Sequence, residues 1–387
     1  MKNQFPFFKH NTDTVFLDSA ASSQIHENVL AKINDVYIHH YSNIHRGIYK
    51  QSEQTSILYE QTRSNLASFI NCDEKEIIWT KGTTESLNLL VNHYYEKLKK
   101  NDVVLLSKME HHSNLVPWQK LKNKGVKLEF INVIDGILDI DDFREKLTDN
   151  VKVVSICHAS NVTGIINPIK EIINQCNIKN IETIIDAAQT FSHLNIDVKS
   201  LNCTYLVFSA HKAYGPNSLG VLYGKFNHLE KLTLYQVGGD TVQTVSYEQT
   251  LFHEPPQCFE AGTPNIVGVI AFNEAINFLK TNRDNNKILL DPLENFLKDN
   301  SFNMVAKNIN RIPIVSFYHP NINNLDFSYY LSIKNICFRV GEHCAMPFIK
   351  ENLGISGSIR FSLGVYNDIN DIDKTIEIIK NFLNRRK

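Results

Sequence analysis

The feature of this chain that most constrains its fold is an alternation of strand-like and helix-like segments between residues 56 and 280. Short apolar runs such as Val151–His158 are typical of buried strands, and the segments between them repeat apolar residues every three to four positions, as helices do. Strands separated by helices need crossover connections, so the alternation predicts an α/β fold with a mostly parallel sheet between helices. Ligands bind such sheets at the carboxyl ends of the strands.

The expected elements can be placed by residue number. We expect strands at 76–80, 102–107, 126–133, 151–158, 181–186, 205–209 and 220–223. We expect helices at 56–70, 84–98, 115–124, 139–147, 168–176 and 266–280. The polar stretch 281–287 follows and is a predicted domain boundary. Beyond it, helices at 289–297, 326–333 and 368–383 and strands at 312–318, 335–340 and 357–363 predict a smaller α+β layer.

Composition argues against several classes of partner. The 40 basic and 41 acidic residues leave a net charge of −1, which disfavours a nucleic-acid-binding surface spread over the molecule. The longest apolar run, Ile266–Phe272, is far shorter than the roughly 18–20 residues of a membrane span, and residues 1–10 lack the apolar core of a signal peptide. The seven cysteines are scattered, with no Cys-x-x-Cys pair, which fits a reducing compartment. We therefore expect a cytoplasmic protein with no membrane or nucleic-acid partner.

A glycine and two threonines follow the first expected strand. Residues Lys81–Glu85 (KGTTE) open a helix, where Thr83 and Thr84 offer hydroxyls beside unpaired backbone N–H groups. The positive end of the helix dipole favours an anion such as a phosphate there. From this motif alone, an ordinary capped helix start is the better supported interpretation.

An acid and a lysine follow two later strands. Asp186 ends the strand at 181–186 and can pair with a cationic ring nitrogen, although capping of the next segment explains it equally well. Lys212 follows the strand at 205–209 among apolar and aromatic neighbours, as an amine nucleophile with a lowered pKa would. Ser209 and His211 can donate to a phosphate. Most lysines are solvated, so the order of Lys212 after the Gly-Thr-Thr and Asp motifs is what favours a functional role.

Two further motifs carry imidazole and thiol groups. His111 and His112 follow the strand at 102–107, where one ring can stack on a planar cofactor. A zinc site needs a third ligand at suitable spacing, which we do not find, so we expect no metal site. Cys344 lies in a glycine-containing loop after a strand, where His343 and Arg339 can favour the thiolate. The alternatives are a polar loop for the histidines and an inert cysteine.

Taken together, these motifs resemble a known family. The chain is similar to fold-type I, pyridoxal-phosphate-dependent enzymes of the class V aminotransferase superfamily, and more narrowly to group II cysteine desulfurases of the sulfur-mobilisation type. The matching segments run in family order across nearly the whole chain: LDSAAS (17–22), NIHRGIY (43–49), KGTTESLN (81–88), MEHHSNLVPWQ (109–119), HASNVTG (158–164), DAAQ (186–189), SAHKAYGP (209–216), FEAGTPN (259–265) and RVGEHCAMP (339–347).

The resemblance implies a role for each matching residue. Lys212 is similar to the lysine that binds the cofactor covalently, and Cys344 to the sulfur-accepting cysteine. Asp186 matches the partner of the pyridinium nitrogen, and His111 the ring-stacking residue, with His112 the next candidate. The remaining cofactor positions are Gln189, Asn161, Thr83, Thr84, Ser209, His211 and, from the other subunit, Thr263. The substrate positions are Arg360, which clamps the carboxylate, Arg339, His45 and Asn161.

The resemblance also implies architecture, reaction and partners. It implies a seven-stranded large domain over 16–280, a small domain formed by 1–15 and 281–387, and a homodimer. The implied reaction converts L-cysteine, with L-selenocysteine as a second candidate substrate, into L-alanine and leaves a persulfide on Cys344. An acceptor protein then takes the sulfur for iron–sulfur cluster assembly. Selenocysteine lyase or cysteine sulfinate desulfinase activity on the same scaffold is the close alternative, and a catalytically inactive scaffold the distant one. The departures from the family pattern are Glu342, Cys258 and Asp240.

Overall fold

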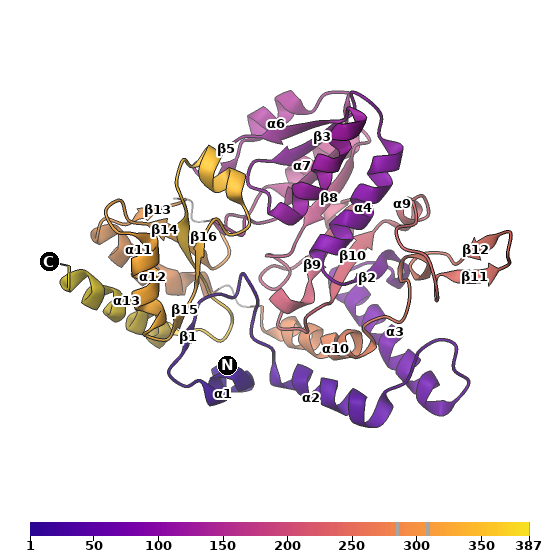
Figure 1. Ribbon diagram of the computed structural model, residues 1–387, viewed down its shortest axis with the longest axis horizontal. Coiled ribbons are helices and arrows are strands. Elements are labelled where there is room, and N and C mark those ends of the chain that lie inside the picture. The colour runs from indigo at the N-terminus through magenta and orange to yellow at the C-terminus, as the bar shows by residue number, and fades with distance from the viewer. Residues whose placement is uncertain (284–285, 307–309, 387) are drawn as a thin grey trace.

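The computed structural model describes residues 1–283, 286–306 and 310–386. Figure 1 shows a large sheet flanked by helices and, beside it, a smaller layer built from the C-terminal part of the chain. The large sheet has seven strands in the order β2-β10-β9-β8-β7-β3-β4, and only β10 runs antiparallel to its neighbours. The predicted mostly parallel seven-stranded sheet is therefore confirmed. Its strands are β2 (Ile77–Thr80), β3 (Val103–Ser107), β4 (Lys127–Ile131), β7 (Val151–Cys157), β8 (Glu182–Asp186), β9 (Tyr205–Ser209) and β10 (Gly220–Gly224).

The central strands are apolar along their whole length because helices cover both faces of the sheet. In β3, Val103 and Leu105 belong to one hydrophobic core, whereas Val104 and Leu106 belong to another. Side chains alternate between faces along a strand, so each face of the sheet has its own core. The first core includes residues of α3 (Lys50–Ile70), α7 (Ile169–Ile178) and α10 (Ile266–Thr281), and the second includes residues of α4 (Thr83–Lys97) and α5 (Val116–Gln119).

The helix expected at 115–124 is wrong in its length. The structure has the four-residue α5 followed by a 3-10 turn, Lys120–Lys124. The left-handed Gly125 (φ 76°) then turns the chain directly into β4, which leaves no room for further α-helical turns.

The structure also contains short elements that the alternation did not predict. The helices among them are α1 (Pro6–His10), α2 (Glu27–Asp35), α8 (Val198–Leu201) and α9 (Phe226–Leu229). The strands form two pairs, β5 (Val133–Ile134) with β6 (Ile137–Leu138) and β11 (Val242–Val245) with β12 (Thr250–Phe252). The helix expected at 139–147 is α6 (Ile140–Lys146).

The smaller layer is a four-stranded antiparallel sheet in the order β13-β14-β17-β16. Its strands are β13 (Asn303–Met304), β14 (Ile314–Tyr318), β16 (Arg339–Gly341) and β17 (Ser358–Ser362), and its helices are α11 (Leu290–Asp299), α12 (Asn324–Ser332) and α13 (Ile369–Asn384). The single strand expected at 335–340 is wrong. The chain instead switches partners within it, because β15 (Ile336–Cys337) pairs with β1 (Val15–Phe16) and β16 pairs with β17.

The N-terminal segment contacts both parts of the molecule. β1 joins the small layer through β15, whereas Phe5 and Phe8 are buried in the first core of the large sheet. The domain limits at 16 and 280 stay a prediction, and residues 284–285 of the expected boundary stretch lie outside the described residues. No helix in the described part of the chain is both long and apolar enough to cross a membrane.

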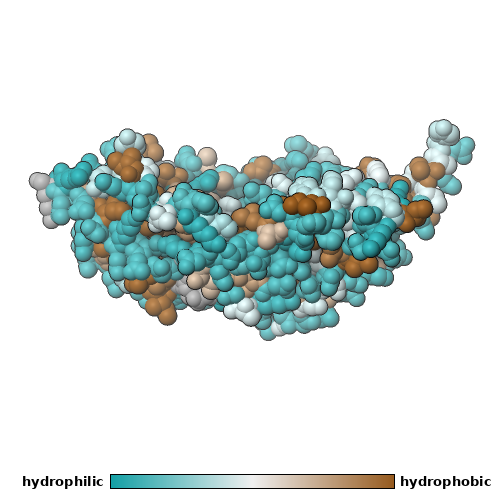
Figure 2. Space-filling view, turned by 90° about the horizontal axis from the view of Figure 1, so that it is seen from below, coloured by the Kyte–Doolittle hydropathy of each residue, from teal (hydrophilic) through white to brown (hydrophobic). Residues whose placement is uncertain are grey.

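The surface is mainly hydrophilic on the face seen in Figure 2, where hydrophobic side chains form separate small patches. The hairpin of β11 and β12 stands out from the body at one end of the molecule (Figures 1 and 2) and carries the exposed side chains of Val245, Tyr247 and Leu251. The active-site candidates lie elsewhere, between the large sheet and the small one.

Candidate active site

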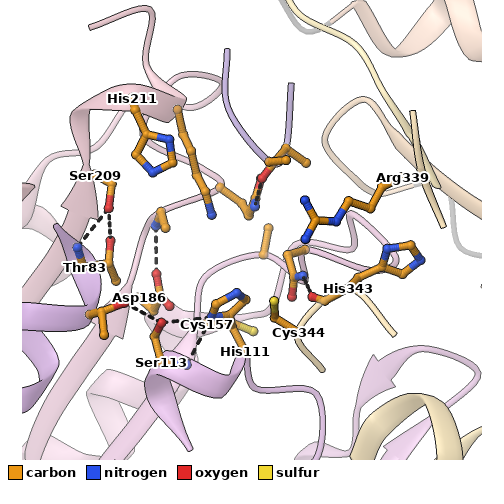
Figure 3. A pocket seen from close by; sticks show the side chains of 18 of the residues that line it. Thr83, His111, Ser113, Cys157, Asp186, Ser209, His211, Arg339, His343 and Cys344 are labelled. Atoms are coloured by element: carbon orange, nitrogen blue, oxygen red, sulfur yellow. Dashed lines mark hydrogen bonds between the residues drawn. The ribbon is translucent and has the colours of Figure 1, made fainter. Parts of the chain in front are cut away.

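One cavity collects most of the predicted site residues. It lies where β2, β3, β7, β8 and β9 end, and β16 and β17 of the small sheet close its other side. Of the fourteen predicted site residues, all except Thr263 and His45 line it, which makes twelve. Figure 3 shows Thr83, Ser209 and His211 at one side of the cavity and Arg339, His343 and Cys344 at the other. Segments up to 340 residues apart in the sequence, from Ala20 to Arg360, therefore share one pocket.

The Thr83 side of the cavity offers hydroxyl donors at the N-terminus of a long helix. The Ser209 hydroxyl accepts a hydrogen bond from the Thr83 backbone N–H at 2.9 Å and lies 2.7 Å from the Thr83 hydroxyl. The Thr84 hydroxyl lies 2.7 Å from that of Ser113. α4 begins at Thr83, so its dipole favours an anion here. This set of donors is suited to a phosphate group.

A glycine in β10 lets this helix start approach the sheet. A Cβ atom on Gly220 would lie 2.3 Å from the Cα of Gly82, so any larger residue would push the turn before α4 away from β10. His211 follows β9 on the same side. Burial lowers the pKa of its ring to about 4, so the ring is neutral near pH 7 and can donate through only one nitrogen.

Lys212 and Asp186 are groups of opposite charge type that line the same cavity. Asp186 ends β8 with 6% of its surface exposed, and its Oδ1 accepts from the Ala188 backbone N–H at 2.9 Å. Burial raises the pKa of this carboxyl and lowers the pKa of the Lys212 amine to about 8, although the attraction between the two groups opposes both shifts. The amine is therefore far more often neutral near pH 7 than an ordinary lysine, which a nucleophile requires.

His111 presents a neutral ring to the same cavity. Burial, followed by the positive charge of Lys212, lowers its pKa to about 3. Its Nδ1 accepts from the Ser113 backbone N–H at 3.1 Å, so the ring proton lies on Nε2. The ring is thus fixed at the N-terminus of a short 3-10 helix, His112–Asn114.

Gln189 and Asn161 line the cavity, and the side-chain amide of each is held by a hydrogen bond to a backbone carbonyl. The Gln189 side-chain amide donates to the Ala20 carbonyl at 2.9 Å. The Asn161 side-chain amide donates to the His343 carbonyl at 2.7 Å, which links the large sheet to the loop that carries Cys344.

Two guanidinium groups lie side by side on the small sheet. Arg339 of β16 and Arg360 of β17 are paired in register. Arg360 is only 3% exposed; its Nη1 donates to the Asn161 carbonyl at 2.9 Å and its Nη2 to Asp18 Oδ1 at 3.2 Å. Its buried Nε has no partner among the residues that the structure describes. A buried guanidinium with a free donor is suited to binding a carboxylate.

Cys344 is exposed and lies at the rim next to these cations. His343 precedes it, but its Nε2 lies 2.9 Å from the Ser358 hydroxyl, and burial lowers the pKa of its ring to about 3. His343 is therefore neutral and does not supply the positive charge that we expected it to give the thiol. The cations of the cavity are Arg339, Arg360 and the protonated form of Lys212.

Comparisons with known proteins identify the family. The Aminotransferase class-V family matches residues 15–375. The chain belongs to this family. The superfamily resemblance found in the sequence is therefore confirmed.

Several relatives of this protein, both in sequence and in structure, are named cysteine desulfurases. It is 35% identical to a cysteine desulfurase of Wigglesworthia glossinidia brevipalpis, over 100% of this chain and 98% of the relative, and 32% identical to one of Haloferax volcanii, over 96% and 90%. Among solved structures, the apo cysteine desulfurase of Thermococcus onnurineus NA1 superposes with a TM-score of 0.94 at 31% identity, covering 98% of this chain and 96% of that one. The cysteine desulfurase CsdA (S-sulfonic acid) of Escherichia coli gives 0.92 at 30% identity, covering 99% and 97%.

Two of the predicted site residues, Thr263 and His45, lie outside the cavity. Thr263 precedes α10 and lines a different cavity with Thr80 and Lys81. His45 is exposed, and its Nε2 lies 3.0 Å from Oε1 of Glu60 in α3. A single chain does not bring these two residues to Lys212, so their roles stay predictions.

The structure also adds residues to which we assigned no role from the sequence. Ser113 orients both Thr84 and His111, and Asp18 accepts from Arg360. Both lie inside matched motifs, MEHHSN and LDSAAS, which is the signal that could have found them. Among the described residues, no group of three or more His, Cys, Asp and Glu is arranged to hold a metal ion.

Proposed function

We propose that this chain is a pyridoxal-phosphate-dependent cysteine desulfurase that converts L-cysteine into L-alanine and forms a persulfide on Cys344. The observation that carries this proposal is that the Lys212 amine, the Asp186 carboxylate and the Cys344 thiol line one cavity. The names of the relatives, which match over nearly the whole chain, support the same activity.

The residues present fit the proposed cofactor. Hydroxyls at the N-terminus of α4 suit its phosphate, and the buried Asp186 carboxylate suits a cationic ring nitrogen. Lys212 offers the amine for covalent attachment, and His111 offers a neutral ring to stack on it. Pyridoxal phosphate, when bound, supplies an electron sink that weakens bonds to the substrate's α-carbon and the bonds next to it.

The chain's own residues account for binding, proton transfer and sulfur transfer. Arg360, with Arg339 beside it, binds the substrate carboxylate, and Lys212 Nζ takes the α-proton of the substrate. The Cys344 thiolate attacks the substrate sulfur, so a sulfur–sulfur bond forms as the carbon–sulfur bond breaks. The carbon skeleton takes up a proton at its β-carbon, regains a proton at its α-carbon from Lys212 Nζ and leaves as alanine. The sulfur stays on Cys344 as a persulfide.

Several finer parts of the proposal concern partners. We infer that the persulfide passes to the cysteine of an acceptor protein for iron–sulfur cluster assembly, because Cys344 is exposed at the rim. In a homodimer, Thr263 and His45 of one subunit would contribute to the cavity of the other subunit. L-Selenocysteine is the second candidate substrate, and a cytoplasmic location remains the expectation from the seven cysteines, all of which are free.

The deciding experiment measures alanine released from L-cysteine in the presence of a reductant. Replacing the nucleophile in Cys344→Ala should reduce the rate by at least about 100-fold, whereas Cys72→Ala, a cysteine outside the cavity, should match the wild type. If Cys344→Ala released alanine from cysteine at the original rate, the nucleophile assignment would be wrong.

The same variant separates the alternatives. L-Cysteine sulfinate and L-selenocysteine lose their sulfur or selenium group without attack by a protein thiol, so Cys344→Ala should keep those reactions if the chain catalyses them. A wild-type protein that acts on these substrates and not on cysteine would be a lyase or desulfinase. A purified protein without the visible absorbance of bound pyridoxal phosphate would be the inactive scaffold.

A further inference from the structure

The backbone that carries Cys344 has an unusual conformation. His343 and Cys344 have φ values of 52° and 55°, in the left-handed region that residues other than glycine rarely adopt. Two such residues in succession persist only when the surrounding structure holds them. We call residues 341–347 the Cys344 loop.

The ends of the Cys344 loop are anchored in different parts of the molecule. On its N-terminal side, β16 belongs to the small sheet. On its C-terminal side, Ala345, Phe348 and Ile349 are fully buried in the first core of the large sheet. The thiol therefore lies on a short span between the two parts, and the contacts of that span decide where the sulfur points.

His112 contacts this span at Cys344 itself and at Met346, two residues further along the chain. Its backbone N–H donates to the Cys344 carbonyl at 2.7 Å, and its ring Nε2 accepts from the Met346 backbone N–H at 3.0 Å. The ring must be neutral, with its proton on Nδ1, to accept that bond. His112 does not line the cavity, in contrast to His111 and Ser113 on either side of it.

We propose that His112 is a positioning residue that holds the Cys344 loop and thereby sets the place of the thiol. This role differs from cofactor stacking, for which the sequence makes His112 the second candidate. The proposal extends the proposed desulfurase function, since its kinetic consequence needs that activity, but its structural consequence does not.

The test compares two amides at position 112. In His112→Gln, Oε1 lies as many bonds from the backbone as Nε2, so it can still accept from Met346. In His112→Asn, the side chain is one bond shorter, so its Oδ1 does not reach the Met346 N–H. The backbone bond to Cys344 remains in both variants, so the pair isolates the side-chain contact. Hydrogen exchange of the Met346 amide, followed by mass spectrometry with fragmentation of peptides covering 339–350, reports the loop directly.

We expect exchange at Met346 to rise about tenfold in His112→Asn and to stay within about twofold of the wild type in His112→Gln, as loss of one hydrogen bond predicts. The kcat for alanine release should fall about tenfold in His112→Asn and recover in His112→Gln. The KM for cysteine and the absorbance of the bound cofactor should not change, because His112 does not touch the cavity.

The proposal would be overturned by exchange equal to the wild type in both variants, or by faster exchange in His112→Asn with an unchanged kcat. A changed cofactor spectrum in both variants would also overturn it, in favour of a role at the cofactor. If the wild type released no alanine from cysteine, the proposed function would fail, and the exchange comparison alone would decide whether His112 holds the loop.

Discussion

The two sides of the cavity are built in different ways. The Thr83 side consists of residues directly after sheet strands, and its groups bond to one another over short distances, as Thr83 does to Ser209. The Cys344 side is a loop in a left-handed conformation, and hydrogen bonds from His112 and Asn161 hold it. Strand ends give a precise position at low conformational cost, whereas a loop allows the thiol to stay exposed. The difference fits the proposed function, in which the cofactor stays bound on the Thr83 side and the sulfur atom leaves from Cys344.

The largest effect in this comparison is expected at Lys212, on the sheet side. Lys212→Ala removes both the proposed attachment point and the proposed base, so alanine release should fall by at least about 1000-fold. Lys212→Arg keeps the positive charge but not the nucleophile and should be as inactive. The readouts are alanine release and the mass of the protein after borohydride reduction with pyridoxal phosphate. Covalent cofactor found on another lysine would contradict the assignment.

A smaller effect is expected from pH on the same residue. Because burial lowers the pKa of Lys212 to about 8, its neutral fraction rises about tenfold per unit as pH increases below 8 and levels off above it. The rate of pyridoxal phosphate attachment to the apo protein between pH 6.5 and 9.5 should follow this curve.

The neighbouring histidines provide a check on that profile. The pKa values of His111 and His211, about 3 and about 4, lie below the measured range, so neither ring contributes to the curve. A rate that still rose about tenfold per unit between pH 8.5 and 9.5, as an ordinary lysine would give, would contradict the buried environment that we describe.

The smallest effect is expected at Glu342, on the loop side. A carboxylate two residues before the thiol would disfavour its thiolate if it pointed inward. Its Oε1 instead lies 2.9 Å from Lys350 Nζ, and Glu342 does not line the cavity. Glu342→Gln should therefore change the alkylation rate of Cys344 by iodoacetamide by less than about twofold, as for an exposed ion pair. Lys350→Met is the matched control. A several-fold faster alkylation in Glu342→Gln would show that the carboxylate does act on the thiol.

Sequence patterns located the elements of the sheet well because the strands are buried on both faces and stay apolar. They failed where local signals compete. The helical spacing of apolar residues over 115–124 suggested a ten-residue helix, but Gly125 turns the chain too soon. The run from 335 to 340 has the pattern of one strand, but it serves two sheets, since Cys337 pairs with Phe16 and Arg339 with Arg360.

The same division applies to the site. The motif after each strand determined, from the sequence by itself, that Asp186, Ser209 and Lys212 would meet at one edge of the sheet, because parallel strands bring their carboxyl ends together. Only the tertiary structure decided that His343 is neutral, that Asp18 pairs with Arg360 and that His112 bonds to the backbone of Cys344 and Met346. These features depend on burial and on hydrogen bonds between residues hundreds of positions apart, and no local pattern encodes them.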